Sequence, residues 1–297
     1  MPRHADFFPA RSSSSRRAQL VDAVFGACVW TTAAVIVAGF LWLVGDIVVH
    51  GLGALDFAFV TEAPTRFGRE GGISTILVST FLILAICLAV SVPLGLATAI
   101  LLAEFSRGRD DVLSKLVRGS LDVLAGVPSI VFGLFGNAFF CIYLGLGFSI
   151  VSGGLTLACM VLPIFIRSVE LGLRAVPADY RLAGAALGMS RATLLRRILL
   201  PAAAPAIAAG LMLGIGRAMA ETAALVFTSG YGDRMPTSLL DSGRALSIHI
   251  YDLATNIPGG EPNAYGSALV LVSLLLVINL AASWTIDRFV GRRVRRV

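Results

Sequence analysis

The sequence predicts an all-α, polytopic membrane protein with six transmembrane helices and both termini in the cytoplasm. Its composition is the first reason: 57% of the 297 residues are hydrophobic, only 14% are charged, and the mean hydropathy is +0.85. Soluble domains carry about 25% charged residues. The second reason is the spacing of the apolar runs, and the third is the alternation of basic residues between them.

Six apolar segments approach or exceed the roughly 20 residues that a helix needs to cross the hydrocarbon. They cover residues 23–49, 73–103, 123–146, 149–168, 202–228 and 266–287. We expect the first to be a separate span that follows a cytoplasmic tail, residues 1–22. The other five belong to one membrane domain, residues 71–287, and a basic cytoplasmic tail, residues 288–297, follows it.

The basic residues fix the orientation. Nineteen of the 24 Lys and Arg residues lie in the two tails and in the second and fourth connections, and four lie in the other connections. The positive-inside rule therefore places both tails in the cytoplasm. The net charge of +6 is then a topology signal and an attraction to anionic membrane lipid, so we expect no nucleic-acid partner.

Arg217 is the one remaining basic residue, and it lies with Glu221 inside the fifth apolar segment. A charge near the centre of a spanning helix costs about 2.5–3.5 kcal/mol. Because the two residues are four positions apart, a continuous helix would let them form an ion pair. Two interpretations remain open. The pair is structural, or Arg217 offers its planar set of donors to a crossing oxyanion and Glu221 holds Arg217 when the pathway is empty.

The fourth connection has the pattern of two short amphipathic helices. Tyr180 and Ala183 share one helix face. Gly188 suits the C-terminal cap of the first helix, and Ser190 suits the N-terminal cap of the second. We expect the second helix to end at Pro201. This connection is too polar to span a membrane and too regular for a free linker.

Two prolines are predicted to shape the spans. Pro128, followed by Ser129, lies early in the third span, where a proline kinks a helix and frees backbone groups. A bend that serves packing and a mobile gate are both open interpretations, and Pro93 in the second span has the same two.

No residue set for catalysis is apparent. The sequence has no G-x-x-x-x-G-K-[ST] phosphate loop and no His, Cys and Asp cluster at metal-ligand spacing. We therefore expect a chain that is not an enzyme, with no catalytic residues, no metal site and no cofactor of its own. A membrane enzyme acting on lipid would need such a set.

The fourth connection resembles the cytoplasmic signature loop of binding-protein-dependent ABC importer permeases. The resemblance rests on the spacing of Ala183, Gly188 and the run Ile198–Pro201, which ends in I-x-L-P. The sequence departs from the family at Leu182, where the family has Glu, and at Gly184, where it has Ala. In that family the loop docks on an ATPase subunit. The resemblance implies coupling residues at Tyr180, Ala183, Gly184, Gly188, Ser190 and Arg191.

Further stretches are similar to the PstA-type permeases of phosphate importers: "GGISTI", "VPLGLATAILLAEF", "LAGVPSIVFGLFG", "LTLACMVLPIFIRSVELGLRAVP" and "GRAMAETAALVFTSG". This resemblance implies a type I ABC importer permease (MetI-like) bundle in the bacterial inner membrane, in which residues 71–287 form the permease domain and residues 170–201 its coupling loop. It also implies a substrate pathway at Arg217, Glu221 and Arg167.

The same resemblance implies the partners. They are a PstC-like second permease, a PstB-like ATPase dimer that binds ATP and Mg, and a PstS-like phosphate-binding protein outside the membrane. Two other functions stay open: the same architecture importing another oxyanion such as phosphonate, sulfate or molybdate, and a scaffold or sensor subunit that transports nothing.

Overall fold

The computed structural model describes residues 16–106 and 112–294. The predicted N-terminal tail lies mostly outside these residues, as does the end of the C-terminal tail. The chain divides into two units, residues 1–49 and 50–297. In the first unit, the described residues form helix α1 (Arg16–Leu52), which is long and apolar enough to cross a membrane from Leu20 onward.

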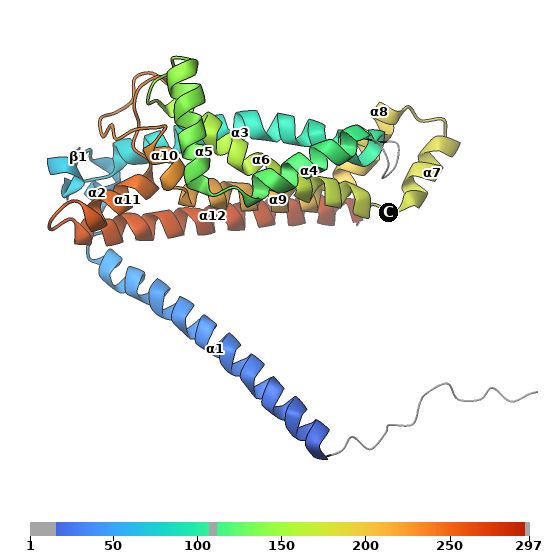
Figure 1. The fold of residues 1–297 in the computed structure, drawn as a ribbon, viewed down its shortest axis with the longest axis horizontal. Coiled ribbons are helices and arrows are strands. Elements are labelled where there is room, and N and C mark those ends of the chain that lie inside the picture. The colour runs from blue at the N-terminus through green and yellow to red at the C-terminus, as the bar shows by residue number, and fades with distance from the viewer. Residues whose placement is uncertain (1–15, 107–111, 295–297) are drawn as a thin grey trace, which may run out of the picture. The chain divides into compact units, whose positions relative to one another are not determined.

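The second unit contains all other elements (Figure 1). In chain order they are α2 (Phe57–Thr61), β1 (Pro64–Thr65), η1 (Arg66–Gly68), β2 (Glu70–Gly71), α3 (Ser74–Ile100), η2 (Leu101–Phe105), α4 (Val112–Gly126), α5 (Ser129–Gly136), η3 (Asn137–Tyr143), α6 (Ile150–Ala175), α7 (Ala178–Ala186), α8 (Arg191–Leu194), η4 (Leu195–Leu199), α9 (Leu200–Ala220), α10 (Ala223–Val226), α11 (Leu246–Thr255) and α12 (Glu261–Val294). The two short strands pair antiparallel, with Pro64 opposite Gly71.

Helices α3, α6 and α9 form the core of this unit and run side by side with α12 (Figure 1). Small residues bring them close together: a Cβ atom at Gly154 would lie 2.6 Å from the Cβ of Ile86, and one at Gly210 would lie 2.8 Å from the Cβ of Ser168. In a membrane, the hydrophobic effect does not drive helices together, because lipid tails are as apolar as the side chains. Helix association therefore depends on such close packing. Close van der Waals contacts at these small residues therefore stabilise the bundle.

The spans agree with the six-helix prediction in number. Among the described residues, five helices are long and apolar enough to cross a membrane, and the number is six if α4 and the bent continuation through α5 and η3 count as one span. Helices α7 and α8 lie at one end of the bundle, while β1, α2 and α11 lie at the other (Figure 1). This arrangement matches the sidedness expected from the basic residues.

The third span differs from the predicted segment, residues 123–146. Helix α4 already begins at Val112, and the chain bends by 104° between Gly126 and Ser129. Pro128 lies at the bend with an extended ψ of 143°. A proline has no N–H to continue the helix and also disfavours helical geometry in the residue before it, so the chain starts a new helix here.

Candidate functional site

The predicted fifth span contains a break that the apolar pattern does not reveal. Helix α9 ends at Ala220, and Glu221 adopts an extended conformation with ψ of 123°. The short helix α10 then starts at Ala223. The predicted continuous helix over 202–228 is wrong, and so is the shared helix face for Arg217 and Glu221, because the chain changes direction between them.

Arg217 and Glu221 each interact with the end of a different helix. Arg217 lies in the last turn of α9, where the exposed carbonyl groups make the helix end partly negative and favour a cation. Glu221 is buried, and its Oε1 accepts a hydrogen bond of 3.2 Å from the N–H of Ala224, at the start of α10. Ser247 from α11 donates a 2.6 Å hydrogen bond to the Glu221 carbonyl oxygen and holds the break from the other side.

The Arg217 guanidinium has no ionic partner in the described part of the chain. Its side chain is exposed, and the ion pairs that the structure contains among residues 16–106 and 112–294 all involve other arginines. The expected Arg217–Glu221 pair is therefore not formed in this conformation.

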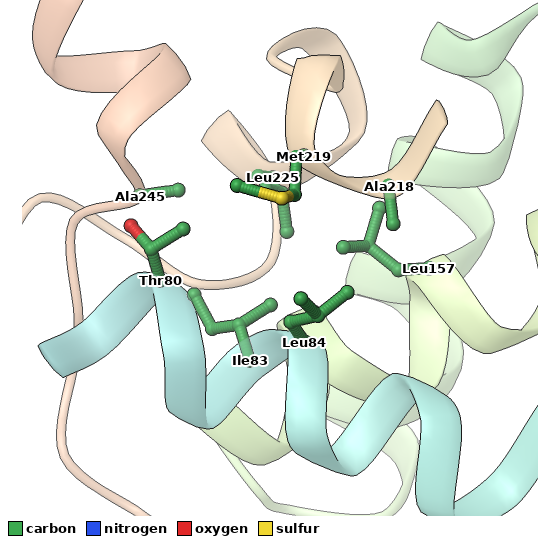
Figure 2. Close-up of a pocket in the computed structure, with 8 residues that line it drawn as sticks. All are labelled: Thr80, Ile83, Leu84, Leu157, Ala218, Met219, Leu225 and Ala245. Carbon is green, nitrogen blue, oxygen red and sulfur yellow. The ribbon is translucent and has the colours of Figure 1, made fainter. Parts of the chain in front are cut away.

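A small enclosed cavity lies directly behind the break (Figure 2). Side chains from α3, α6, α9 and α10 line it, and its volume is about 10 Å³. Its one hydroxyl group, on Thr80, is already used, because it donates to the Ile76 carbonyl and accepts from the Leu246 N–H. A cavity of this size is at the lower limit for a single water molecule. It cannot pass an anion.

Helix α5 packs across the break after the bend at Pro128. A Cβ atom at Gly133 would lie 2.8 Å from the Cα of Ala224. Asn137 adds a 2.8 Å hydrogen bond from its Nδ2 to the carbonyl of Phe227. Pro128 and Ser129 thus lie where the direction of α5 is set, whereas Pro93 lies inside α3, which continues through it.

Arg167 lies on α6 within a cluster of charges that sequence reasoning missed. Glu170 is 2% exposed, and its carboxylate accepts from Arg118 at 3.0 Å, from Arg174 at 3.0 Å and from Arg167 at 3.4 Å. Arg118 and Arg174 also donate to the carbonyl of Leu102. The spacing R-x-x-E-x-x-x-R in α6 places both arginines within reach of the carboxylate, and this spacing was the signal that could have revealed the cluster.

The coupling loop confirms the two predicted caps. Gly188 has a positive φ of +67° after α7, and the Ser190 side chain accepts from the N–H of Thr193 at the start of α8. The predicted end of the second helix at Pro201 is wrong. A π-helical segment, η4, joins α8 directly to α9, so the helix runs from Arg191 to Ala220 and Pro201 lies in the first turn of α9. Pro201 therefore lies inside a continuous helix, where it has no N–H to donate to the preceding turn, and the π-helical hydrogen-bond pattern of η4 directly precedes it.

The outer face of α7 is open. Tyr180, Ala183 and Leu187 are all exposed, and so is Arg191 at the start of α8. Gly184 is buried instead, with its Cα against the Leu194 side chain.

The other face of α7 is fixed to the bundle by Arg181. Its guanidinium donates to both carboxylate oxygens of Glu104, at 3.1 and 2.6 Å, and to the carbonyls of Leu173 and Val176. Hydrogen bonding to Glu104 raises the pKa of Arg181. Any displacement of α7 is therefore passed directly to the ends of α3 and α6.

Comparison with known proteins agrees with this architecture. Residues 91–296 match the family model described as "Binding-protein-dependent transport system inner membrane component". The chain is 34% identical over 281 residues to the Bacillus subtilis protein named "Probable ABC transporter permease protein YqgI", which covers 90% of this chain and 94% of that protein. It is 36% identical over 236 residues to "Phosphate transport system permease protein PstA 1" of Mycobacterium tuberculosis, which covers 79% of this chain and 74% of that protein.

The fold is shared with a chain of a solved bacterial ABC transporter involved in the import of the acidic polysaccharide alginate. The TM-score is 0.63 at 14% identity, over 91% of this chain and 98% of that chain. The candidate spans, the helical connection between α6 and α9, and the family match over residues 91–296 point the same way. The chain belongs to the family of binding-protein-dependent transport system inner membrane components, and it is a multi-pass transport subunit of the bacterial inner membrane.

Proposed function

We propose that this chain forms half of the transmembrane pathway of an ATP-driven importer of inorganic phosphate. Relatives named as PstA phosphate permeases are 30% identical over 91% of this chain and 36% identical over 79% of it. The observation that carries the proposal is Arg217, an exposed arginine that lies at the end of an apolar helix and has no carboxylate partner among residues 16–106 and 112–294. A guanidinium in that position is favourable when a passing anion supplies the missing charge, and its planar donors fit phosphate.

The pathway runs between this chain and a second permease of the PstC type. The enclosed cavity beside the break holds about 10 Å³, so an anion has no route through it, and Arg217 lies instead at an exposed surface. Glu221 contributes by holding the break between α9 and α10, which directs the last turn of α9 and with it Arg217.

ATP acts through the coupling loop. A PstB-like ATPase dimer, which binds ATP and Mg, contacts the exposed face of Tyr180, Ala183 and Leu187. Closure of the dimer moves α7, and the Arg181–Glu104 pair passes this movement to the end of α3. A PstS-like protein delivers phosphate at the opposite end of the bundle. ATP binding and hydrolysis then bias a bundle with two states, open to either side.

The test is uptake of radiolabelled phosphate by the assembled complex with Arg217→Ala and Arg217→Lys. We expect Arg217→Ala to assemble normally and to lose uptake, while Arg217→Lys keeps part of it, because lysine retains the charge but not the planar donors. Arg234→Ala, which removes an exposed arginine from the connection after α10, is the matched control. Uptake by Arg217→Ala equal to that of the control would overturn the assignment and favour a scaffold subunit.

The same assay identifies the substrate. Unlabelled sulfate, molybdate and phosphonate are added in excess to the wild-type complex. We expect only phosphate itself to compete strongly, and equal competition by another oxyanion would replace phosphate in the proposal.

A further inference from the structure

Helix α4 sends one charged side chain, Arg118, toward the protein and carries several apolar side chains on its exposed side. Val112, Leu116 and Val123 are exposed, whereas Arg118 reaches inward to the buried Glu170 of α6. Ionisable residues at membrane depth almost always face the bundle interior or a water-filled cavity. The Arg118–Glu170 pair therefore lies inside the bundle, between α4 and α6.

Glu170 binds Arg167 from the buried side. Its carboxylate is almost fully buried and accepts from three guanidinium groups, those of Arg118, Arg167 and Arg174. Removing one partner of a buried ion pair is strongly destabilising because the other charge is left uncompensated. The Arg167 nitrogen that faces Glu170 is therefore held by a buried carboxylate.

Asp122 holds the other end of the same guanidinium in a very different way. Its Oδ1 lies 2.6 Å from Nη2 of Arg167, and the two side chains are 63% and 40% exposed. An exposed pair of this kind adds little net free energy, because water and salt compete with it. Asp122 is thus an exchangeable ligand of Arg167, and Glu170 is the fixed one.

The register of α6 against α9 places Arg167 relative to Arg217. The two helices pack antiparallel, with Gly172 against Ala206 and Ser168 against Gly210. Arg167 is then level with the residue after Gly210, six positions before Arg217. At 1.5 Å per residue, Arg167 lies about 9 Å farther along the axis, toward the end that carries α7 (Figure 1).

We propose that Arg167 forms a second, cytoplasm-side site for a tetrahedral oxyanion, that Asp122 is the carboxylate displaced from it, and that Glu170 is the positioning residue. The inference rests on the proposed function. An anion that leaves Arg217 replaces Asp122 on the free side of the Arg167 guanidinium. The return of Asp122 then expels the anion into the cytoplasm, so the site empties without a large conformational change.

The experiment uses the complete complex in proteoliposomes with the ATPase side facing the lumen. Inorganic phosphate is loaded into the lumen at increasing concentration, and initial uptake is measured for wild type, Asp122→Asn and the control Glu261→Gln, which removes an exposed carboxylate at the start of α12. Because Asp122→Asn removes the competitor, we expect lumenal phosphate to inhibit it at about fivefold lower concentration than wild type, as the loss of an exposed ion pair allows. Phosphate is also a product of ATP hydrolysis, and its inhibition of the ATPase is the same in wild type and in both variants.

Glu170→Gln tests the positioning role in the same assay. We expect the double variant Asp122→Asn with Glu170→Gln to return to wild-type inhibition, because Arg167 is no longer held for the anion. Since Asp122 is exposed, Asp122→Asn alone keeps the test valid if the Glu170 variants do not assemble.

A phosphate group on a lipid has the same chemistry, so the assay is run in phosphatidylcholine and again with phosphatidylglycerol. An equal shift in both lipids supports a site for free oxyanion, and a shift only with phosphatidylglycerol overturns it in favour of a lipid headgroup. Inhibition of Asp122→Asn identical to that of Glu261→Gln overturns the inference as well. If wild type imports phosphate and Arg217→Ala does not, that result leaves the proposed function standing.

Discussion

Arg217 and Glu221 are tolerated in an apolar segment because the helix breaks between them. The end of α9 carries a partial negative charge that favours Arg217, and the start of α10 carries a partial positive charge that favours Glu221. Each interaction is worth about 0.3–1 kcal/mol at an exposed site and up to about 2 kcal/mol at a buried one. This offsets part of the cost of each charge without an ion pair, and it leaves the Arg217 donors free.

This account predicts different results for two substitutions of Glu221. Glu221→Gln keeps an oxygen that accepts from the Ala224 N–H, so we expect nearly normal stability and uptake. Glu221→Ala removes the acceptor and should lower the unfolding free energy by about 1 kcal/mol, as the loss of a helix cap does, together with uptake. The measurements are thermal unfolding of the purified complex and phosphate uptake. Equal loss of uptake in both variants would instead show that the negative charge acts on Arg217.

At the scale of single elements, local signals were sufficient for the two caps between α7 and α8, but not for the end of the second helix, which does not stop at Pro201. Gly188 and Ser190 were identified from their neighbours in sequence, because a C-terminal glycine and a capping serine act within one helical turn. The end of α9 was not predictable in this way. Apart from Arg217, Glu221 and Thr222, the segment up to Phe227 carries no polar side chain, and Ser247, which is distant in sequence, bonds to the Glu221 carbonyl at the break. The position at which α9 ends therefore involves tertiary contacts that a local pattern does not contain.

A substitution at Gly188 tests whether the conformation of the turn between α7 and α8 affects transport. A Cβ atom added there would meet nothing within 4 Å, and the only obstacle is the positive φ of +67°. Gly188→Ala should therefore cost about 1 kcal/mol through backbone strain alone and shift α7. We expect more ATP to be hydrolysed per phosphate imported. Gly188→Asn is the matched control, because asparagine tolerates this conformation better. If both variants keep the wild-type ratio, the angle at Gly188 does not set the coupling.

At the scale of the whole molecule, the fold was predictable, but of the charge cluster only the part within α6 was. Apolar length and basic alternation determine the number and direction of the crossings, and both are properties of the chain taken in order. The contact between Arg118 and Glu170 joins residues 52 positions apart, and it depends on the packing of α4, the helix before the bend, on α6. A single sequence gives no register for such a contact.

The absence of a route through the described cavity leads to a prediction for the isolated chain. The cavity behind the break holds about 10 Å³, while Arg217 and Arg167 both lie at the surface, which fits the proposed pathway, in which a second permease supplies the other wall. We expect the chain reconstituted alone in liposomes to pass no phosphate. Release of entrapped phosphate is followed with a fluorescent sensor, and the complete complex with ATP serves as the positive control. Flux through the chain alone at a rate near that of the complex would mean that copies of this chain can complete the pathway without a different permease.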